Sequence, residues 1–200
     1  SGRAEAEAVV AEIAALGGRA AALALDVAKS GSFDAFAAEI GGTLASVWNR
    51  DRFDFLVNNA GIGLHAAFAE TTEAQFDEMM AIHLKAPYFL TQKLLPLIAD
   101  GGRIVNISTG TTRIILPGYS AYATMKGGIE VLTRYMAKEL GPRRIAVNAV
   151  APGAVETDFR GGAVRDNPQM NAMIASQTAL GRVGLPDDIG AMVASLLSPE

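Results

Sequence analysis

The sequence contains no cysteine and only two histidines in 200 residues. A disulfide framework and a thiolate metal site are therefore excluded, and two histidines far apart in the chain do not predict a zinc site. Aromatic residues make up 6% of the chain, which suits a core of small aliphatic side chains. The formal net charge is −4 and no basic block occurs, so we expect neither nucleic acid nor an anionic membrane as a partner.

Long hydrophobic runs are missing as well. No stretch of about 18 residues is free of polar interruption, and no signal peptide is visible, so we expect no membrane partner and take the cytoplasm as the default location. Apolar residues nevertheless make up 50% of the chain. A chain of this length can form one domain, residues 1–200, with a sizeable core.

Helical and strand-like patterns alternate along the chain. The first helix is expected to end at Gly17-Gly18, and the helix after residue 122 to end at Gly141-Pro142. The helix after residue 72 is expected to open on a Thr72–Gln75 capping box and to kink or restart at Pro87. The alternation predicts an α/β fold, a doubly wound Rossmann-type parallel sheet with helices on both faces. The expected helices are 1–16, 33–47, 72–98, 122–140 and 186–196, and the expected strands are 20–25, 53–58, 103–107 and 145–150.

The helix after residue 122 carries a tyrosine and a lysine four positions apart, Tyr122 and Lys126. Residues with this spacing are neighbours on one helix face. A lysine ammonium about 4 Å from a phenol would favour the phenolate, so we expect it to lower the tyrosine pKa toward working pH. Such a tyrosine could act as a general acid or base. The pair alone is a weak motif, since a surface helix acquires it by chance.

Three other segments stand around this pair in the sequence. Leu56-Val-Asn-Asn-Ala-Gly61 is a strand-like run that ends in amides and glycine, and Arg103-Ile-Val-Asn-Ile-Ser108 is followed by Thr109, thirteen positions before Tyr122. Val147-Asn-Ala-Val-Ala-Pro-Gly153 is followed by Thr157. In this order and spacing, over nearly the whole chain, the motifs resemble the short-chain dehydrogenase/reductase family, and in particular its ketoacyl-reductase-like members.

The resemblance implies roles for the residues that match. Thr109 would hydrogen-bond the carbonyl oxygen of the substrate, where the family usually has serine, and its alternative is an ordinary strand-end cap. Tyr122 would give its proton to that oxygen, and Lys126 would lower the tyrosine pKa and bind the nicotinamide ribose. Tyr119 lies too far from Lys126 along the helix and is expected to form a pocket wall instead.

His83 departs from the family pattern, which usually has asparagine at this point of a helix to hold a water that relays protons to the lysine. An imidazole can also anchor a water or pass a proton near neutral pH. The alternative is a core histidine whose ring is satisfied by the backbone. The sequence leaves both interpretations open.

The resemblance also implies a nicotinamide dinucleotide cofactor. Asp26 and the Val27 backbone would meet the adenine, although Asp26 can equally cap the next segment. Arg3 would be placed to meet a 2′-phosphate, which favours NADP slightly over NAD. The adenosine ribose would lie against the backbone of Asn58, Ala60 and Gly61, and the nicotinamide carboxamide against Pro152, Gly153, Val155 and Thr157. The alternatives for these two groups are strand bracing and a generic turn.

One part of a doubly wound nucleotide-binding fold has no counterpart in the sequence. No G-x-x-x-G-x-G turn precedes the first helix, and the first and last strands of such a sheet are not found. The strand that ends at Asp26 would then have no neighbour for its backbone groups. We therefore expect the 200 residues to be part of a longer product, with a rewired sheet as the alternative.

The motifs together predict an NAD(P)-dependent oxidoreductase that interconverts a ketone and a secondary alcohol. The alternative is a non-catalytic dinucleotide-binding or scaffold protein, which the replacements at Thr109 and His83 motivate. Residues 156–180 are expected to cover an uncharged or partly apolar substrate, although Arg113 or Arg160 could instead meet an acidic tail. The family resemblance further implies a homodimer or homotetramer through the helices at 76–98 and 122–140.

Overall fold

The computed structural model describes residues 2–198 of the chain. Its centre is a parallel sheet in the order β1-β2-β3, formed by β1 (Phe53–Asn58), β2 (Ile98–Ile107) and β3 (Ala146–Val150). The register places Asn58 opposite Asn106, and Ile107 opposite Val150. All three strands therefore end at one edge of the sheet.

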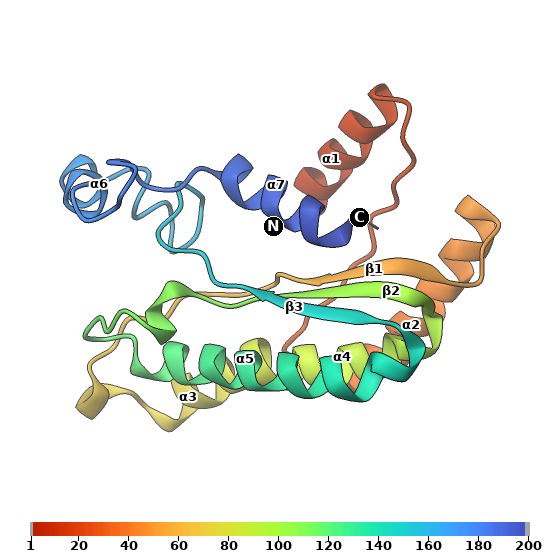
Figure 1. Ribbon diagram of the computed structural model, residues 1–200, viewed down its shortest axis with the longest axis horizontal. Helices are drawn as coiled ribbons and strands as arrows, with labels where there is room; N and C mark the ends of the chain where they lie inside the picture. Colours follow the sequence, from red (N-terminus) through yellow and green to blue (C-terminus); the bar gives the residue numbers. More distant parts are fainter. Residues whose placement is uncertain (1, 199–200) are drawn as a thin grey trace.

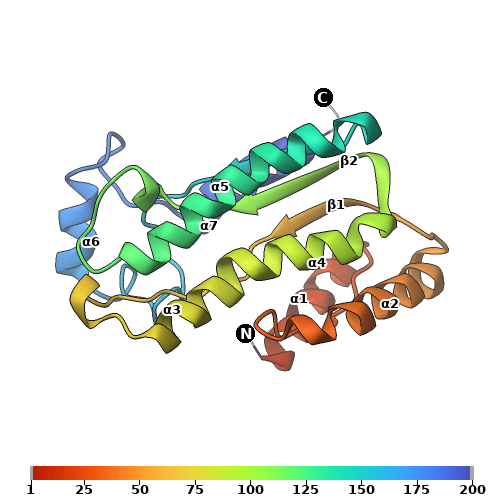
Figure 2. The ribbon, with the colours of Figure 1, turned by 90° about the horizontal axis from the view of Figure 1, so that it is seen from below.

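Helices cover both faces of this sheet, as the α/β pattern predicts (Figures 1 and 2). Helices α2 (Phe33–Thr43), α3 (Glu73–Met80), α4 (Ala86–Leu94) and α5 (Ser120–Leu140) lie on one side, and α1 (Arg3–Ala15) and α7 (Pro186–Leu197) lie on the other. Helix α6 (Pro168–Ala175) projects beyond the carboxyl edge of the strands. Shorter helical turns are η1 (Ser30–Ser32), η2 (Leu44–Trp48), η3 (Phe68–Glu70), η4 (Ala81–Lys85), η5 (Leu95–Leu97), η6 (Gly110–Thr112) and η7 (Gly141–Arg143).

Several local predictions are confirmed. The Thr72 hydroxyl accepts a hydrogen bond from the Gln75 N–H, and the Gln75 side chain accepts one from the Thr72 N–H, so the capping box forms. Helix α5 ends at Leu140, directly before Gly141. The predicted break at Pro87 is not found, because the backbone stays helical from α3 through the π-helical turn η4 into α4, and Pro87 lies within this continuous helix.

Other boundaries were predicted wrongly. The predicted helix to Ile98 ends earlier, because η5 follows Leu94 and Ile98 already opens β2. The stretch 156–180, predicted without regular structure, contains α6, and the Asn167 side chain caps it by accepting from the Met170 N–H at 2.9 Å. Of the predicted helix 1–16, Ser1 lies outside the described residues.

The predicted strand 20–25 is also wrong. Residues 18–26 have no regular secondary structure, because none of the strands within residues 2–198 runs beside them to share a hydrogen-bond ladder. Leu25 and Val27 instead hold this segment in place by packing against Phe33, Leu90 and their neighbours.

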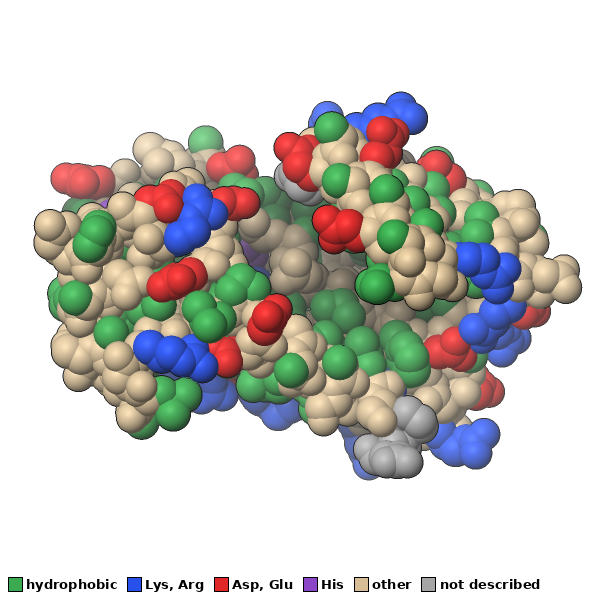
Figure 3. Space-filling view, turned by 90° about the horizontal axis from the view of Figure 1, so that it is seen from above, with side chains coloured by type: hydrophobic (Ala, Val, Ile, Leu, Met, Phe, Trp, Pro, Cys, Tyr) green, Lys and Arg blue, Asp and Glu red, His purple; other side chains and the backbone are tan. Residues whose placement is uncertain are grey.

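One edge of β1 remains half-exposed, with Phe55 at 47% and Val57 at 38%. A cavity of about 520 Å³ lies between this edge and residues 23–27, and Asn58, Ala60 and Ile82 contribute to its wall. Figure 3 shows the molecule hollowed on the side of α1 and α7, with hydrophobic side chains at the floor. Within residues 2–198, no helix combines the length and apolar character needed to cross a membrane.

Candidate active site

Three loops meet where the strands end. Backbone hydrogen bonds continue past the strands here, because the Ser108 N–H donates to the Val150 oxygen and the Gly110 N–H to the Pro152 oxygen, both at 2.7 Å. The loop after β2 is thereby fixed against the loop after β3. In open α/β sheets, ligands bind at this carboxyl edge.

Tyr122 and Lys126 lie at the beginning of α5, beside these loops. Their side chains face the protein interior together, with 8% and 5% of each residue exposed. The Lys126 Nζ lies 5.9 Å from the centroid of the Tyr122 ring and donates a hydrogen bond to the Ile107 oxygen at 2.6 Å. The four-residue spacing therefore places both groups on one face of the helix, next to the end of β2.

The pKa of Tyr122 differs from the prediction. It is raised above its ordinary value, chiefly because burial disfavours the phenolate, while a hydrogen bond with the Thr109 side chain lowers it. The Lys126 pKa is lowered to about 8, also by burial. The expected depression of the Tyr122 pKa by Lys126 is wrong for this structure, because desolvation of the phenol dominates and the Lys126 ammonium faces the Ile107 carbonyl.

The hydroxyls at positions 108 and 109 point to different partners. Thr109 lies next to the Tyr122 phenol, where it acts to lower the tyrosine pKa, and it accepts from the Thr111 N–H at 3.3 Å, so it caps the short turn η6. The Ser108 hydroxyl faces the other way and donates to Glu130 Oε1 at 2.9 Å. Thr109 is therefore the hydroxyl that lies beside Tyr122. It also forms a cap at the end of the strand, which was the alternative role predicted for it.

His83 is almost fully buried in the π-helical turn η4, and its ring meets the Tyr122 ring edge-on at 5.2 Å. Its Nε2 lies 2.8 Å from the Ile62 oxygen, whereas Nδ1 has no hydrogen-bond partner within residues 2–198. Burial, and then the charge of Lys126, lower the His83 pKa to about 4. The histidine is therefore neutral at pH 7, satisfied by backbone at one nitrogen and open at the other.

This neutral histidine should make the protein sensitive to acid. Between pH 6.5 and pH 4 the unfolded chain binds a proton at His83 and the folded chain does not, so folding stability falls as the pH falls. We expect His83 to account for a loss of about 2 kcal/mol between pH 7 and pH 5. Urea unfolding at both pH values should show that His83→Asn reduces the loss, whereas the same change at the exposed His65 keeps it. An equal loss in all three proteins would contradict this assignment.

The residues predicted for the cofactor fall into two groups. Val27, Asn58 and Ala60 line the cavity beside β1, but the Asn58 side chain is engaged in bracing, because its Nδ2 donates to Asn106 Oδ1 at 2.8 Å and to Thr91 Oγ1 at 3.0 Å. Asp26 is exposed and accepts from the Ala28 N–H at 3.1 Å in a local turn, but its side chain caps neither η1 nor α2, so it is not the helix cap that was its alternative.

The second group lies nearer to Tyr122. Pro152 and Gly153 pack beside Gly110 in the loop next to Thr109, and open space surrounds the position that a Cβ on Gly153 would take. Val155 pairs with Gly184 in a parallel bridge, and the Thr157 hydroxyl accepts from the Phe159 N–H at 3.2 Å. These bonds shape the loop after β3 and leave the Pro152-Gly153 backbone facing the site.

Gly61, the last of the residues predicted for the cofactor, lies in the loop after β1, next to His83. A Cβ at this position would lie 2.8 Å from the His83 ring, closer than real contacts allow. Glycine therefore lets the loop after β1 pass directly over the histidine.

The whole chain matches a known protein family. The family model described as enoyl-(acyl carrier protein) reductase matches residues 2–200. An uncharacterized oxidoreductase from Methylorubrum extorquens is 36% identical over 201 residues, which cover 100% of this chain and 78% of that protein. The chain belongs to the short-chain dehydrogenase/reductase family. As a member of this family, the protein is an NAD(P)-dependent oxidoreductase.

Several reductases of the short-chain dehydrogenase/reductase family are similar to this chain in structure or in sequence. The reductase LugOII, which catalyses keto-reduction at C1 during lugdunomycin biosynthesis, superposes with a TM-score of 0.93 at 35% identity, over 100% of this chain and 78% of its own. The angucycline C-6 ketoreductase LanV with bound NADP gives a TM-score of 0.89 at 35% identity, over 96% and 74%. A hydroxynaphthalene reductase-like protein from Metarhizium brunneum is 31% identical over 98% of this chain and 75% of its own.

Sequence reasoning missed two parts of this short-chain dehydrogenase/reductase site. The carboxylate of Glu130 contacts the loop around Thr109, and the only hint in the sequence is its place one helical turn after Lys126. The Arg160 guanidinium stacks on the Tyr119 ring, 5.2 Å from its centroid, and donates to its hydroxyl. Tyr119 is thus engaged with the loop after β3, and its role as a pocket wall stays a prediction.

Proposed function

We propose that this enzyme reduces a ketone to a secondary alcohol, with NADPH as the hydride donor and Tyr122 as the proton donor. The observation that carries the proposal is the convergence of three buried groups at the carboxyl edge of the sheet: the Thr109 side chain next to the Tyr122 phenol, with the Lys126 ammonium beside the same ring. LanV, a ketoreductase with bound NADP, supports both the reaction and the choice of cofactor.

The residues of the site fit a nicotinamide dinucleotide. The Lys126 ammonium makes one hydrogen bond to protein within residues 2–198, to Ile107, so it keeps donors for a ribose. Open space at Gly153 lets a flat ring approach the backbone. The cavity beside Val27, Asn58 and Ala60 would take the adenosine end. When bound, the cofactor supplies the hydride.

The protein side of the reaction follows from the protonation states. Because the Tyr122 pKa is raised, the phenol carries its proton at neutral pH and can donate it to a carbonyl oxygen. The Thr109 hydroxyl donates a hydrogen bond to the same oxygen and orients it. Lys126, with a pKa of about 8, is largely charged at pH 7 and stabilises the phenolate that the proton transfer leaves. The free Nδ1 of His83 would hold a water that returns the proton.

Residues 156–180 would cover the substrate. The Phe159 ring lies 6.1 Å from the Tyr122 ring and gives the site an apolar wall. Arg113 is paired with Glu130 at 3.2 Å, which engages one side of its guanidinium. The cover therefore favours an uncharged or partly apolar ketone, and Arg160 is the residue that would meet an acidic substituent.

A ketone panel tests the function. The purified protein is mixed with NADPH or NADH and with 3-oxoacyl thioesters, aliphatic ketones and bicyclic aromatic ketones, and cofactor absorbance is followed. We expect oxidation of the cofactor with at least one ketone, faster with NADPH. Cofactor binding without turnover on any ketone would favour the scaffold alternative, and preference for NADH would overturn the NADP assignment.

We also propose that the enzyme pairs with a second copy through the outer faces of α3, α4 and α5. Exposed apolar side chains gather there, among them Phe76, Met80, Tyr88, Phe89 and Tyr135, around a groove of about 330 Å³. We expect light scattering to give two or four times the chain mass, and Phe89→Glu to lower it. Phe68→Glu, at an exposed position on η3 away from this patch, is the control. A monomeric mass for the unmodified protein would refute the pairing.

A further inference from the structure

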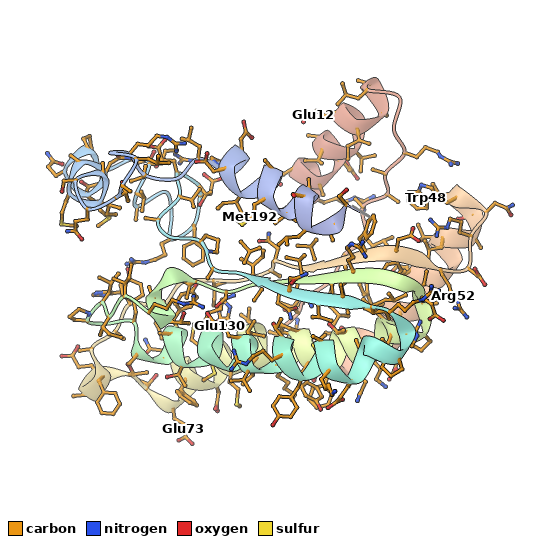
Figure 4. The ribbon with its side chains drawn as sticks, in the orientation of Figure 1. Glu12, Trp48, Arg52, Glu73, Glu130 and Met192 are labelled. Atoms are coloured by element: carbon orange, nitrogen blue, oxygen red, sulfur yellow. The ribbon has the colours of Figure 1, made fainter. Side chains whose placement is uncertain are left out.

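A single carboxylate fastens the loop after β2 to helix α5. Glu130 lies on α5, one turn beyond Lys126, and its side chain is only 16% exposed. Its Oε1 accepts from the Ser108 hydroxyl at 2.9 Å and from the Thr112 hydroxyl at 2.8 Å. The Arg113 guanidinium completes the cluster, with Nη2 3.2 Å from Oε2. Figure 4 shows Glu130 coming from α5.

The donors to Glu130 stand on both sides of Thr109 in the sequence. Ser108 precedes it, and Thr112 and Arg113 follow it at the far end of the turn η6, which Thr109 itself caps. The Ser108 hydroxyl also lies 3.3 Å from the Lys126 backbone oxygen. The carboxylate therefore holds the segment that carries Thr109 on the helix that carries Tyr122 and Lys126.

We propose that Glu130 is a positioning residue for ketone reduction, which acts by holding the Thr109 hydroxyl at the distance from Tyr122 that the carbonyl oxygen requires. This inference rests on the proposed function. Two hydroxyl bonds to one partly buried carboxylate are charge-assisted and restrict the loop from both ends. A displacement of about 1 Å in a catalytic group can lower the rate by roughly 100-fold, so losing this anchor should be visible in turnover.

The variants separate positioning from charge. Glu130→Ala removes every bond to the loop, and we expect kcat for ketone reduction to fall about 10- to 100-fold with little change in KM for the cofactor. Glu130→Gln keeps an oxygen that can accept from Ser108 and Thr112, so it should retain more than one third of the wild-type kcat. Arg113→Gln removes only the exposed ion pair and serves as the control with near wild-type activity.

A double-mutant cycle with Thr109→Val shows whether Glu130 acts through Thr109. We expect Glu130→Ala to cost less than threefold in kcat when Thr109 is already valine. Additive losses would overturn the positioning role. Equal losses in the Ala and Gln variants, together with a shifted pH–rate profile in both, would also overturn it, because they would mean that the negative charge itself acts on Tyr122.

Hydrogen exchange tests the anchor without any turnover. We expect Glu130→Ala to raise amide exchange in residues 110–114 by about tenfold or more while the amides of α5 after residue 132 stay protected. Unchanged exchange in 110–114 would refute the anchor even if activity fell. If the unmodified protein reduces no ketone, the proposed function fails, and the exchange result still decides whether Glu130 holds the loop.

Discussion

Replacing Tyr122 with phenylalanine is expected to lower kcat for ketone reduction by about 10²- to 10⁴-fold, the usual contribution of a general acid. Phenylalanine fills the same buried space but has no proton to give. Cofactor binding should persist, because Lys126 and the loop after β3 are untouched. Stopped-flow absorbance with saturating NADPH measures the loss.

Tyr119→Phe is the matched control for this change. Tyr119 stands three positions earlier and loses only a hydroxyl that Arg160 contacts, so its kcat should stay within about threefold of wild type. If Tyr122→Phe kept more than a tenth of the wild-type kcat, another group would have to deliver the proton. The Tyr122 phenol stays protonated between pH 6 and pH 8, so the reduction rate should fall only about twofold over this range, as Lys126 with its pKa of about 8 loses half of its charge.

Replacing Lys126 with methionine should have two separate effects, one on turnover and one on stability. Turnover should fall by about 100-fold or more, because the phenolate left by proton transfer loses its neighbouring positive charge. The pH dependence of stability should change as well. Between pH 8 and pH 10.5 the unfolded chain binds a proton at Lys126 that the folded chain does not, so the free energy of unfolding rises with pH in this window.

The stability effect can be measured separately from activity. The contribution of Lys126 to the free energy of unfolding should be about 2 kcal/mol more favourable at pH 9.5 than at pH 7.5, and Lys126→Met should lack this gain. Urea unfolding at the two pH values provides the comparison. Lys138→Met changes an exposed lysine on the same helix and should keep the gain. A gain that persists in Lys126→Met would contradict the lowered pKa.

The sequence predicted the parts of the site that depend on local spacing. Four residues of helix place Tyr122 and Lys126 on one face, and strands that end in hydroxyls and glycine bring Thr109 and Gly153 to one edge. These relations follow from helical and strand periods alone. Roles for the cofactor residues stay predictions, since the structure shows where they lie and not what they bind.

Properties that depend on burial or on distant partners could not be predicted. The direction of the Tyr122 pKa follows from desolvation, which a spacing argument does not contain. Glu130 meets Ser108 across 22 positions of sequence, so no local pattern reveals it. The apolar run at 20–25 has the composition of a strand, but whether it becomes one depends on a neighbouring strand to share its hydrogen bonds.

The π-helical turn around His83 has a mechanical consequence. The buried positions Met79, His83, Ala86, Leu90 and Leu94 span fifteen residues in four intervals, or 3.75 residues each. An ideal α-helix would rotate these positions by about 60° out of line over that length. The wider turn at Ala81–Lys85 absorbs the excess, so this stretch is underwound. A change that restored regular α-helical pitch at Ala81–Lys85 would move the His83 ring away from the Tyr122 ring or rotate Leu94 out of its packing. The orientations of His83 and Leu94 therefore depend on each other through this turn.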